Sequence, residues 1–179
     1  MDGPQLLSLY NTMVLPHVQY CLINWGNFKG DRNIRLRDRL IALQKRLVRI
    51  ISGATKLSHS DPIFFNLGTL KVDNLFVHSV RVFSYQAFKG SLPVGMANMI
   101  GKNDHGHMTR GARSNFFIQR SNCRSIKSIA PKIWNILSAE LKMSPSIASF
   151  KERSKRDLLG PYGLFVCSVR GCLSCAPLP

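Results

Sequence analysis

Arginine side chains recur within residues 32–51 at spacings that place them on one side of a predicted helix. This arginine stripe consists of Arg32, Arg35, Arg39, Arg46 and Arg49. At about 100° per residue it lies roughly 100° from a leucine stripe formed by Leu36, Leu40, Leu43, Leu47 and Ile50. Guanidinium groups form forked hydrogen bonds with phosphate oxygens. The pattern predicts a helix that packs through its leucine stripe and presents arginines to phosphates, without base-specific contacts.

Further cations extend this predicted nucleic-acid-binding set. The supporting members are Lys45, Arg110, Arg113, Arg120 and Arg124. If six of the cations each neutralise one phosphate, the logarithm of affinity falls with the logarithm of salt at a slope of roughly −4 to −5. A solvated helix face is the simpler alternative for the stripe. Membrane or calmodulin binding fits less well, because the helix has no Trp or Phe anchor, and we expect no membrane partner.

The overall charge favours a polyanionic partner. Lys and Arg number 25 against 9 Asp and Glu, so the formal net charge is +16. Charged residues make up only 19% of the chain, which means that the imbalance arises from a shortage of acids. Phosphate backbones are the first candidate for the partner, anionic lipid headgroups the second and an acidic protein the third.

The same shortage of acids argues against a self-contained active site or metal site. Two-metal phosphoryl transfer needs clustered carboxylates, and no two acidic residues here are adjacent. The sequence has no nucleophile elbow, zinc-protease motif, P-loop or dinucleotide-binding motif. His105 and His107 lack neighbouring ligands, and Cys167, Cys172 and Cys175 supply only three ligands of a zinc knuckle. We therefore expect no catalytic residue, metal or cofactor.

Hydrophobic periodicity predicts a mainly α-helical fold. Residues 6–25 indicate a helix, a kink at Pro16 and a second helix, and not a membrane span, because polar residues interrupt the segment. A long helix follows from about Arg32 to Ile51. Residues 101–127 are predicted to form an irregular basic loop, and two further helices are expected before a short tail.

Aromatic residues in the chain could stack on bases or pack in the core. Trp25 and Trp134 lie within helical apolar periodicity, which favours the core. Phe116 and Phe117 lie between Arg113 and Arg120, and for these two both interpretations remain open. The five cysteines are scattered and no secretory signal is evident, so we expect an intracellular protein, nuclear or cytoplasmic, that is not secreted.

Five segments occur in an order that resembles one protein family. They read LYNTMVLPHVQYCLINWG at 9–26, LQKRLVRIISGA at 43–54, DPIFFNLGTLKVDNLF at 61–76, HMTRGARSNFFIQR at 107–120 and SIAPKIWNILSAELKMSPSIASFKERSK at 128–155. The chain resembles the region that follows the catalytic palm in reverse transcriptases of LINE-type, jockey-like non-LTR retrotransposons.

This resemblance implies a domain organisation. A thumb-like helical bundle at 1–56 and a helical segment at 57–100 that packs on it precede the basic loop at 101–127. Two C-terminal helices at 128–159 and a disordered tail at 160–179 complete the chain. The palm aspartates of the family have no counterpart here, so the resemblance implies part of an RNA-directed DNA polymerase without its activity.

The resemblance and the charge pattern together predict function. We expect a nucleic-acid-binding fragment that grips the backbone of an RNA or DNA duplex, with the missing palm domain of the parent polymerase as a further partner. The alternatives are a non-catalytic helical protein-interaction module, whose cationic face meets an acidic protein, and a non-functional retroelement remnant.

Overall fold

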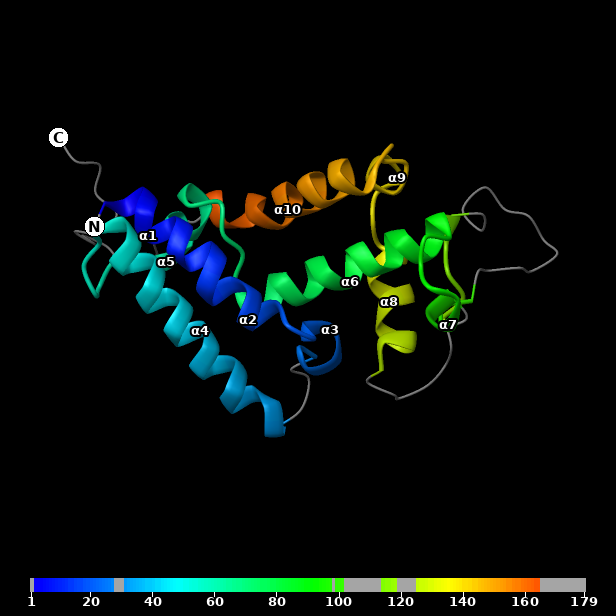
Figure 1. Cartoon of the computed structure of the whole chain (residues 1–179), viewed down its shortest axis with the longest axis horizontal. Helices are drawn as coiled ribbons and strands as arrows, with labels where there is room; N and C mark the ends of the chain where they lie inside the picture. The colour runs from blue at the N-terminus through cyan, green and yellow to red at the C-terminus, as the bar shows by residue number, and fades with distance from the viewer. Residues whose placement is uncertain (1, 28–30, 98, 102–113, 119–124, 165–179) are drawn as a thin grey trace. The chain divides into compact units, whose positions relative to one another are not determined.

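The computed structural model is mainly α-helical, which confirms the predicted fold class (Figure 1). It describes residues 2–27, 31–97, 99–101, 114–118 and 125–164. For residues 31–33, 94 and 97 it describes the backbone alone. The chain divides into two compact units, each built from stretches that are distant in sequence.

The first unit comprises residues 1–20, 30–75 and 156–179, and the second comprises residues 21–29 and 76–155. Much of the predicted basic loop and most of the predicted tail lie outside the described residues.

In the first unit, the N-terminal segment forms one helical run through a proline. It consists of α1 (Gly3–Leu9), the π-helix η1 (Tyr10–Val14) and α2 (Leu15–Gln19). In η1 the Leu15 N–H donates to the Tyr10 carbonyl, five residues back. This wider turn lies directly before Pro16, whose missing N–H interrupts the ordinary helical pattern. The helical run therefore continues past Pro16, the position of the expected kink, and the backbone leaves the helix at Cys21, where φ is +49°.

Helix α4 (Asp31–Ser52) is the longest element of the first unit. It ends at Gly53, whose φ of +66° closes the helix at little steric cost. The helices α1 and α5 (Ser60–Asn66) pack against it. The side of α4 that they cover includes Gln44, Val48 and Ile51, all of which are buried.

The leucine stripe of α4 is not its packing face, which corrects the sequence-based prediction. Leu36, Leu43 and Ile50 are 47%, 56% and 56% exposed, and the remaining two members, Leu40 and Leu47, are half-buried. Periodicity identifies an apolar arc but not the arc that neighbouring helices use. The buried arc lies about 100° away and includes polar Gln44, whose side-chain amide makes three hydrogen bonds.

Two long helices carry residues of both units. Helix α6 (Val72–Lys89) starts in the first unit and continues into the second, and α10 (Ile147–Gly163) starts in the second and ends in the first. The second unit also contains α3 (Leu22–Trp25), α7 (Val94–Ala97), α8 (Ile126–Asn135) and α9 (Ala139–Lys142). A Cβ at Gly26, which ends α3, would lie 2.7 Å from the Phe76 ring, so only glycine fits there.

Aromatic side chains fill the core of the second unit. Trp134 is completely buried. The centre of its ring lies 5.6 Å from the ring centre of Phe116 and 5.3 Å from that of Phe88. This confirms the core assignment of Trp134, and Trp25 is half-buried. Phe116 is buried and Phe117 is 48% exposed, so the two phenylalanines have different environments.

Within the described part of the chain, no helix combines the length and the apolar character needed to cross a bilayer.

Candidate nucleic-acid interface

A buried glutamine attaches α4 to the rest of the first unit. The Gln44 side-chain amide donates to the Tyr10 hydroxyl at 3.0 Å and to the Leu70 carbonyl at 3.4 Å, and its oxygen accepts from the Val72 N–H at 2.8 Å. Burial raises the pKa of Tyr10. Because a buried amide is costly unless its bonding groups are paired, this network fixes the rotation of α4 about its axis.

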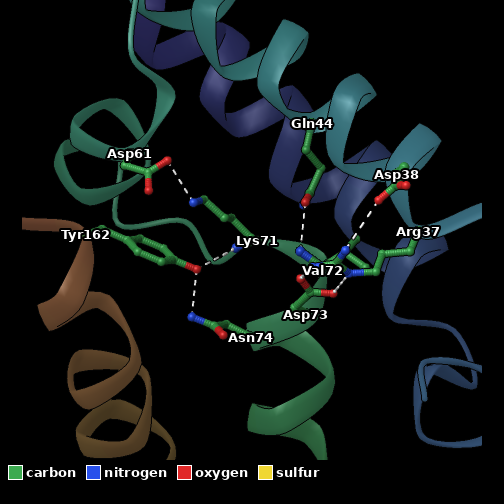
Figure 2. Close-up of polar contacts among 9 residues, drawn as sticks. All are labelled: Arg37, Asp38, Gln44, Asp61, Lys71, Val72, Asp73, Asn74 and Tyr162. Atoms are coloured by element: carbon green, nitrogen blue, oxygen red, sulfur yellow. Dashed lines mark hydrogen bonds and ion pairs between the residues drawn. The ribbon is translucent and has the colours of Figure 1, made fainter. Parts of the chain in front are cut away.

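An ion pair fixes the same side of the helix nearer its start. The guanidinium of Arg37 bonds to the Asp73 carboxylate through Nε to Oδ1 at 2.8 Å and through NH2 to Oδ2 at 2.6 Å. Figure 2 shows Arg37 reaching Asp73 at the start of α6, within the first unit. A third contact joins Arg37 NH1 to Asp38 Oδ1 at 3.3 Å. The hydrogen bonds to Asp73 raise the pKa of Arg37 further above its usual value.

A third polar contact lies near the end of α4. Arg49 Nε donates to the Ser58 carbonyl at 2.9 Å, and the side chain is half-buried. Arg49 therefore holds the loop that follows the helix, although the sequence places it in the arginine stripe. Lys45 is half-buried on the flank between the covered side and the arginine stripe.

Arg35, Arg39 and Arg46 are exposed on the side of α4 opposite its buried residues. We call these three residues the arginine face. At about 100° per residue they fall within about 40° of one another and roughly 180° from the centre of the buried arc. At about 1.5 Å per residue they extend about 16 Å along the helix, the length of roughly five phosphates of one strand.

Two acidic side chains of the first unit, Asp61 and Asp73, pair with residues outside the arginine face. Asp73 pairs with Arg37, and Asp61 forms an ion pair with Lys71, whose Nζ lies 2.7 Å from Asp61 Oδ1. Both ion pairs are drawn in Figure 2. Helix α4 itself contains seven Lys or Arg against two Asp. The positive charge of the outer side of α4 is therefore not cancelled by these neighbouring carboxylates, and it is available to an external anion.

The remaining predicted binding residues lie outside the described part of the structure. This holds for the side chain of Arg32 and for Arg110, Arg113, Arg120 and Arg124. It also holds for the histidines and the tail cysteines considered as metal ligands. Among the residues that the structure describes, no three His, Cys, Asp or Glu side chains are grouped as a metal site requires.

The structure brings together residues that periodicity did not identify. Lys142 is buried in the second unit, where its Nζ bonds to Asn115 Oδ1 at 3.0 Å and lies 5.8 Å from the centre of the Trp134 ring. Burial lowers the pKa of Lys142. Asn135 exchanges hydrogen bonds with both backbone groups of Phe116, at 2.9 and 3.0 Å. No sequence signal marks these hydrogen bonds, because their partners are 19 to 27 residues apart in the chain.

Comparison of the chain with protein-family models, with curated proteins and with solved structures finds no match.

Proposed function

We propose that this chain is the nucleic-acid-binding, post-palm part of a retrotransposon reverse transcriptase. In this proposal, Arg35, Arg39 and Arg46 contact the phosphates of a template–primer duplex of RNA or DNA. The resemblance of the five sequence segments suggests the parent enzyme, and the geometry of α4 supports the binding role.

The proposal depends on one observation, which is that the residues that attach α4 to the first unit are different from the arginines that it exposes. Arg37, Gln44 and Arg49 hold the helix to the first unit, and the arginine face lies on the outer side. A helix held in this way presents its guanidinium groups at fixed spacing, so less conformational entropy is lost when phosphates bind. Contacts of this kind position a duplex without reading its sequence.

The salt dependence of binding tests the proposal. Fluorescence anisotropy with a labelled duplex of about 20 base pairs, as DNA and as an RNA–DNA hybrid, measures affinity between about 50 and 300 mM salt. The variant Arg35→Gln/Arg39→Gln/Arg46→Gln removes three phosphate contacts. Its slope of log affinity against log salt should be shallower than that of the wild type by about 2 to 3, at about 0.9 per contact for DNA.

A charge-matched variant provides the control. Lys56, Lys127 and Lys132 are exposed and lie outside α4. The variant Lys56→Gln/Lys127→Gln/Lys132→Gln changes the net charge by the same amount and should retain the wild-type slope within about 1. Equal effects of the two triple variants would indicate a diffuse field instead of a binding face. Absence of wild-type binding at low salt would reject the proposal altogether.

A further inference from the structure

The leucine stripe of α4 is only partly covered in the described structure. Leu36, Leu43 and Ile50 are each about half exposed. The leucine stripe lies between the arginine face and the buried arc of α4. Helices α1 and α5 pack on the buried arc. Exposed apolar side chains in a continuous row are typical of a docking surface.

The spacing of the stripe favours a helix as the occupant. Its five members are separated by four, three, four and three residues, which is the repeat of the a and d positions of a coiled coil. The stripe spans about 80° of the helix circumference, which suits a narrow helix–helix seam. A membrane-binding face is usually broader and carries aromatic anchors, which this stripe lacks.

The flanking charge determines the type of helix. Arg39 and Arg46 are seven residues apart and border the stripe on the side away from the buried arc, at the position written g in the heptad. In an antiparallel pair of identical α4 helices, these arginines would face those of the other copy. Like charges at this position oppose self-association, whereas Glu or Asp on the partner would form interhelical ion pairs.

We propose that the leucine stripe of α4 docks an acidic amphipathic helix of a partner protein, with apolar residues against the stripe and carboxylates against Arg39 and Arg46. This goes beyond nucleic-acid binding and does not depend on it. Because the two arginines also belong to the arginine face, a docked acidic helix competes with a duplex for them.

A pair of synthetic helices tests the docking. The first has three heptads with Leu at a and d and Glu at e and g, and the second has Lys in place of Glu. Mutual repulsion of like charges keeps each peptide from pairing with itself. Fluorescence anisotropy with the full chain should detect binding of the Glu peptide and at least tenfold weaker binding of the Lys peptide.

Two variants separate the stripe from other apolar surface. Leu36→Ser/Leu43→Ser should weaken binding of the Glu peptide about a hundredfold, because each leucine is an anchor in the seam. Its duplex binding should remain, which distinguishes this inference from the proposed function. The control Leu57→Ser/Met143→Ser changes two residues that are 88% and 73% exposed and lie outside α4, and it should bind the Glu peptide normally. Circular dichroism checks that both variants keep their helical content.

Several results would overturn the inference. The first is undetectable binding of the Glu peptide, and the second is equal binding of the Glu and Lys peptides. The third is an equal loss of Glu-peptide binding in Leu36→Ser/Leu43→Ser and in the control Leu57→Ser/Met143→Ser. Sedimentation that shows a dimer of the wild type, abolished by Leu36→Ser/Leu43→Ser, would assign the stripe to a second copy. Binding to phosphatidylserine vesicles that the same variant abolishes would assign it to a lipid surface.

Discussion

Arg37 and Asp73, 36 residues apart in the sequence, form a bidentate ion pair between the first half of α4 and the first turn of α6. Its two hydrogen bonds, of 2.8 and 2.6 Å, match the planar fork of a guanidinium to the two oxygens of a carboxylate. The carboxylate also lies where the positive end of the α6 dipole favours a negative charge. This arginine therefore serves the fold, whereas Arg35 and Arg39 point to solvent.

Removal of this ion pair should destabilise the protein. Each partner is about one third exposed, so Arg37→Met should lower the free energy of unfolding by about 1 kcal/mol, less than for a buried pair. Urea unfolding followed by circular dichroism measures the loss. Arg35→Met is the matched control and should change stability by less than about 0.5 kcal/mol. A similar loss in both variants would contradict the structural role of Arg37.

Two arginines of the predicted stripe, Arg46 and Arg49, should respond differently to the same substitution. Arg46→Gln should make the salt slope of duplex binding shallower by about 1 and leave stability unchanged, because the side chain is exposed. Arg49→Gln should lower stability by about 1 kcal/mol, because the Ser58 carbonyl loses its donor. Anisotropy titrations and urea unfolding of both variants measure the difference. The reverse pattern would show that Arg49 faces the duplex.

The second unit contains a histidine that should make stability depend on pH. Burial, together with the nearby charges of Arg81, Lys155 and Lys151, lowers the pKa of His78 to about 4. The ring nitrogen Nδ1 lies 3.3 Å from the Ser154 hydroxyl. In the unfolded chain a histidine has a pKa of about 6.5. Between pH 6.5 and 4 the unfolded state therefore binds more protons than the folded state.

The contribution of neutral His78 to the free energy of unfolding should therefore be fully present above pH 6.5. It should be lost as the pH is lowered from 6.5 to 4. The difference between a pKa of about 6.5 and one of about 4 corresponds to at most about 3 to 4 kcal/mol, and partial exposure of His78 reduces the expected loss to about 2 kcal/mol. His78→Gln keeps a neutral polar side chain and should remove this part of the pH dependence. Unfolding by urea at several pH values measures it. If the variant loses as much stability as the wild type between pH 6.5 and 4, His78 is not responsible.

The sequence is sufficient to predict the main helices of the fold. The long helix ends where Gly53 adopts a positive φ, and α6 ends in the same way at Gly90, where φ is +71°. The end of a helix can be predicted from neighbouring residues alone, because the glycine and the change of periodicity that mark it lie within one turn of each other. The buried position of Trp134 follows from the same periodicity.

The orientation of α4 could not be predicted from periodicity, because two arcs of this helix are able to pack. The observed arc contains Arg37 and Gln44, which look unfavourable in a core until Asp73, Tyr10, Leu70 and Val72 supply their hydrogen-bonding partners. Those partners lie 26 to 36 residues away in the chain. The candidate site is affected in the same way: Arg35, Arg39 and Arg46 share an exposed face as expected, whereas Arg49 is engaged by a loop carbonyl.

Tyr162, near the end of α10, should contribute to stability through its contacts with Lys71 and Asn74 in the first unit. Its hydroxyl oxygen accepts hydrogen bonds from Asn74 Nδ2 at 2.7 Å and from the Lys71 N–H at 3.3 Å, and Lys71 Nζ lies 4.7 Å from the ring centre. Figure 2 shows the two hydrogen bonds of the Tyr162 hydroxyl. Tyr162→Phe keeps the ring but leaves the Lys71 N–H without this acceptor, so the free energy of unfolding should fall by about 1 kcal/mol.

The same burial raises the pKa of Tyr162 to about 12. Since the unfolded tyrosine ionises near pH 10, stability from this residue should be complete below pH 10 and lost as the pH rises towards 12. Tyr10 also has a raised pKa, so more than one tyrosine of the wild type should ionise late. An alkaline titration that follows the ultraviolet absorbance of phenolate should show one late-ionising tyrosine fewer in Tyr162→Phe than in the wild type. An unchanged late step in the variant would mean that the Tyr162 hydroxyl is not shielded by its contacts with Asn74 and Lys71.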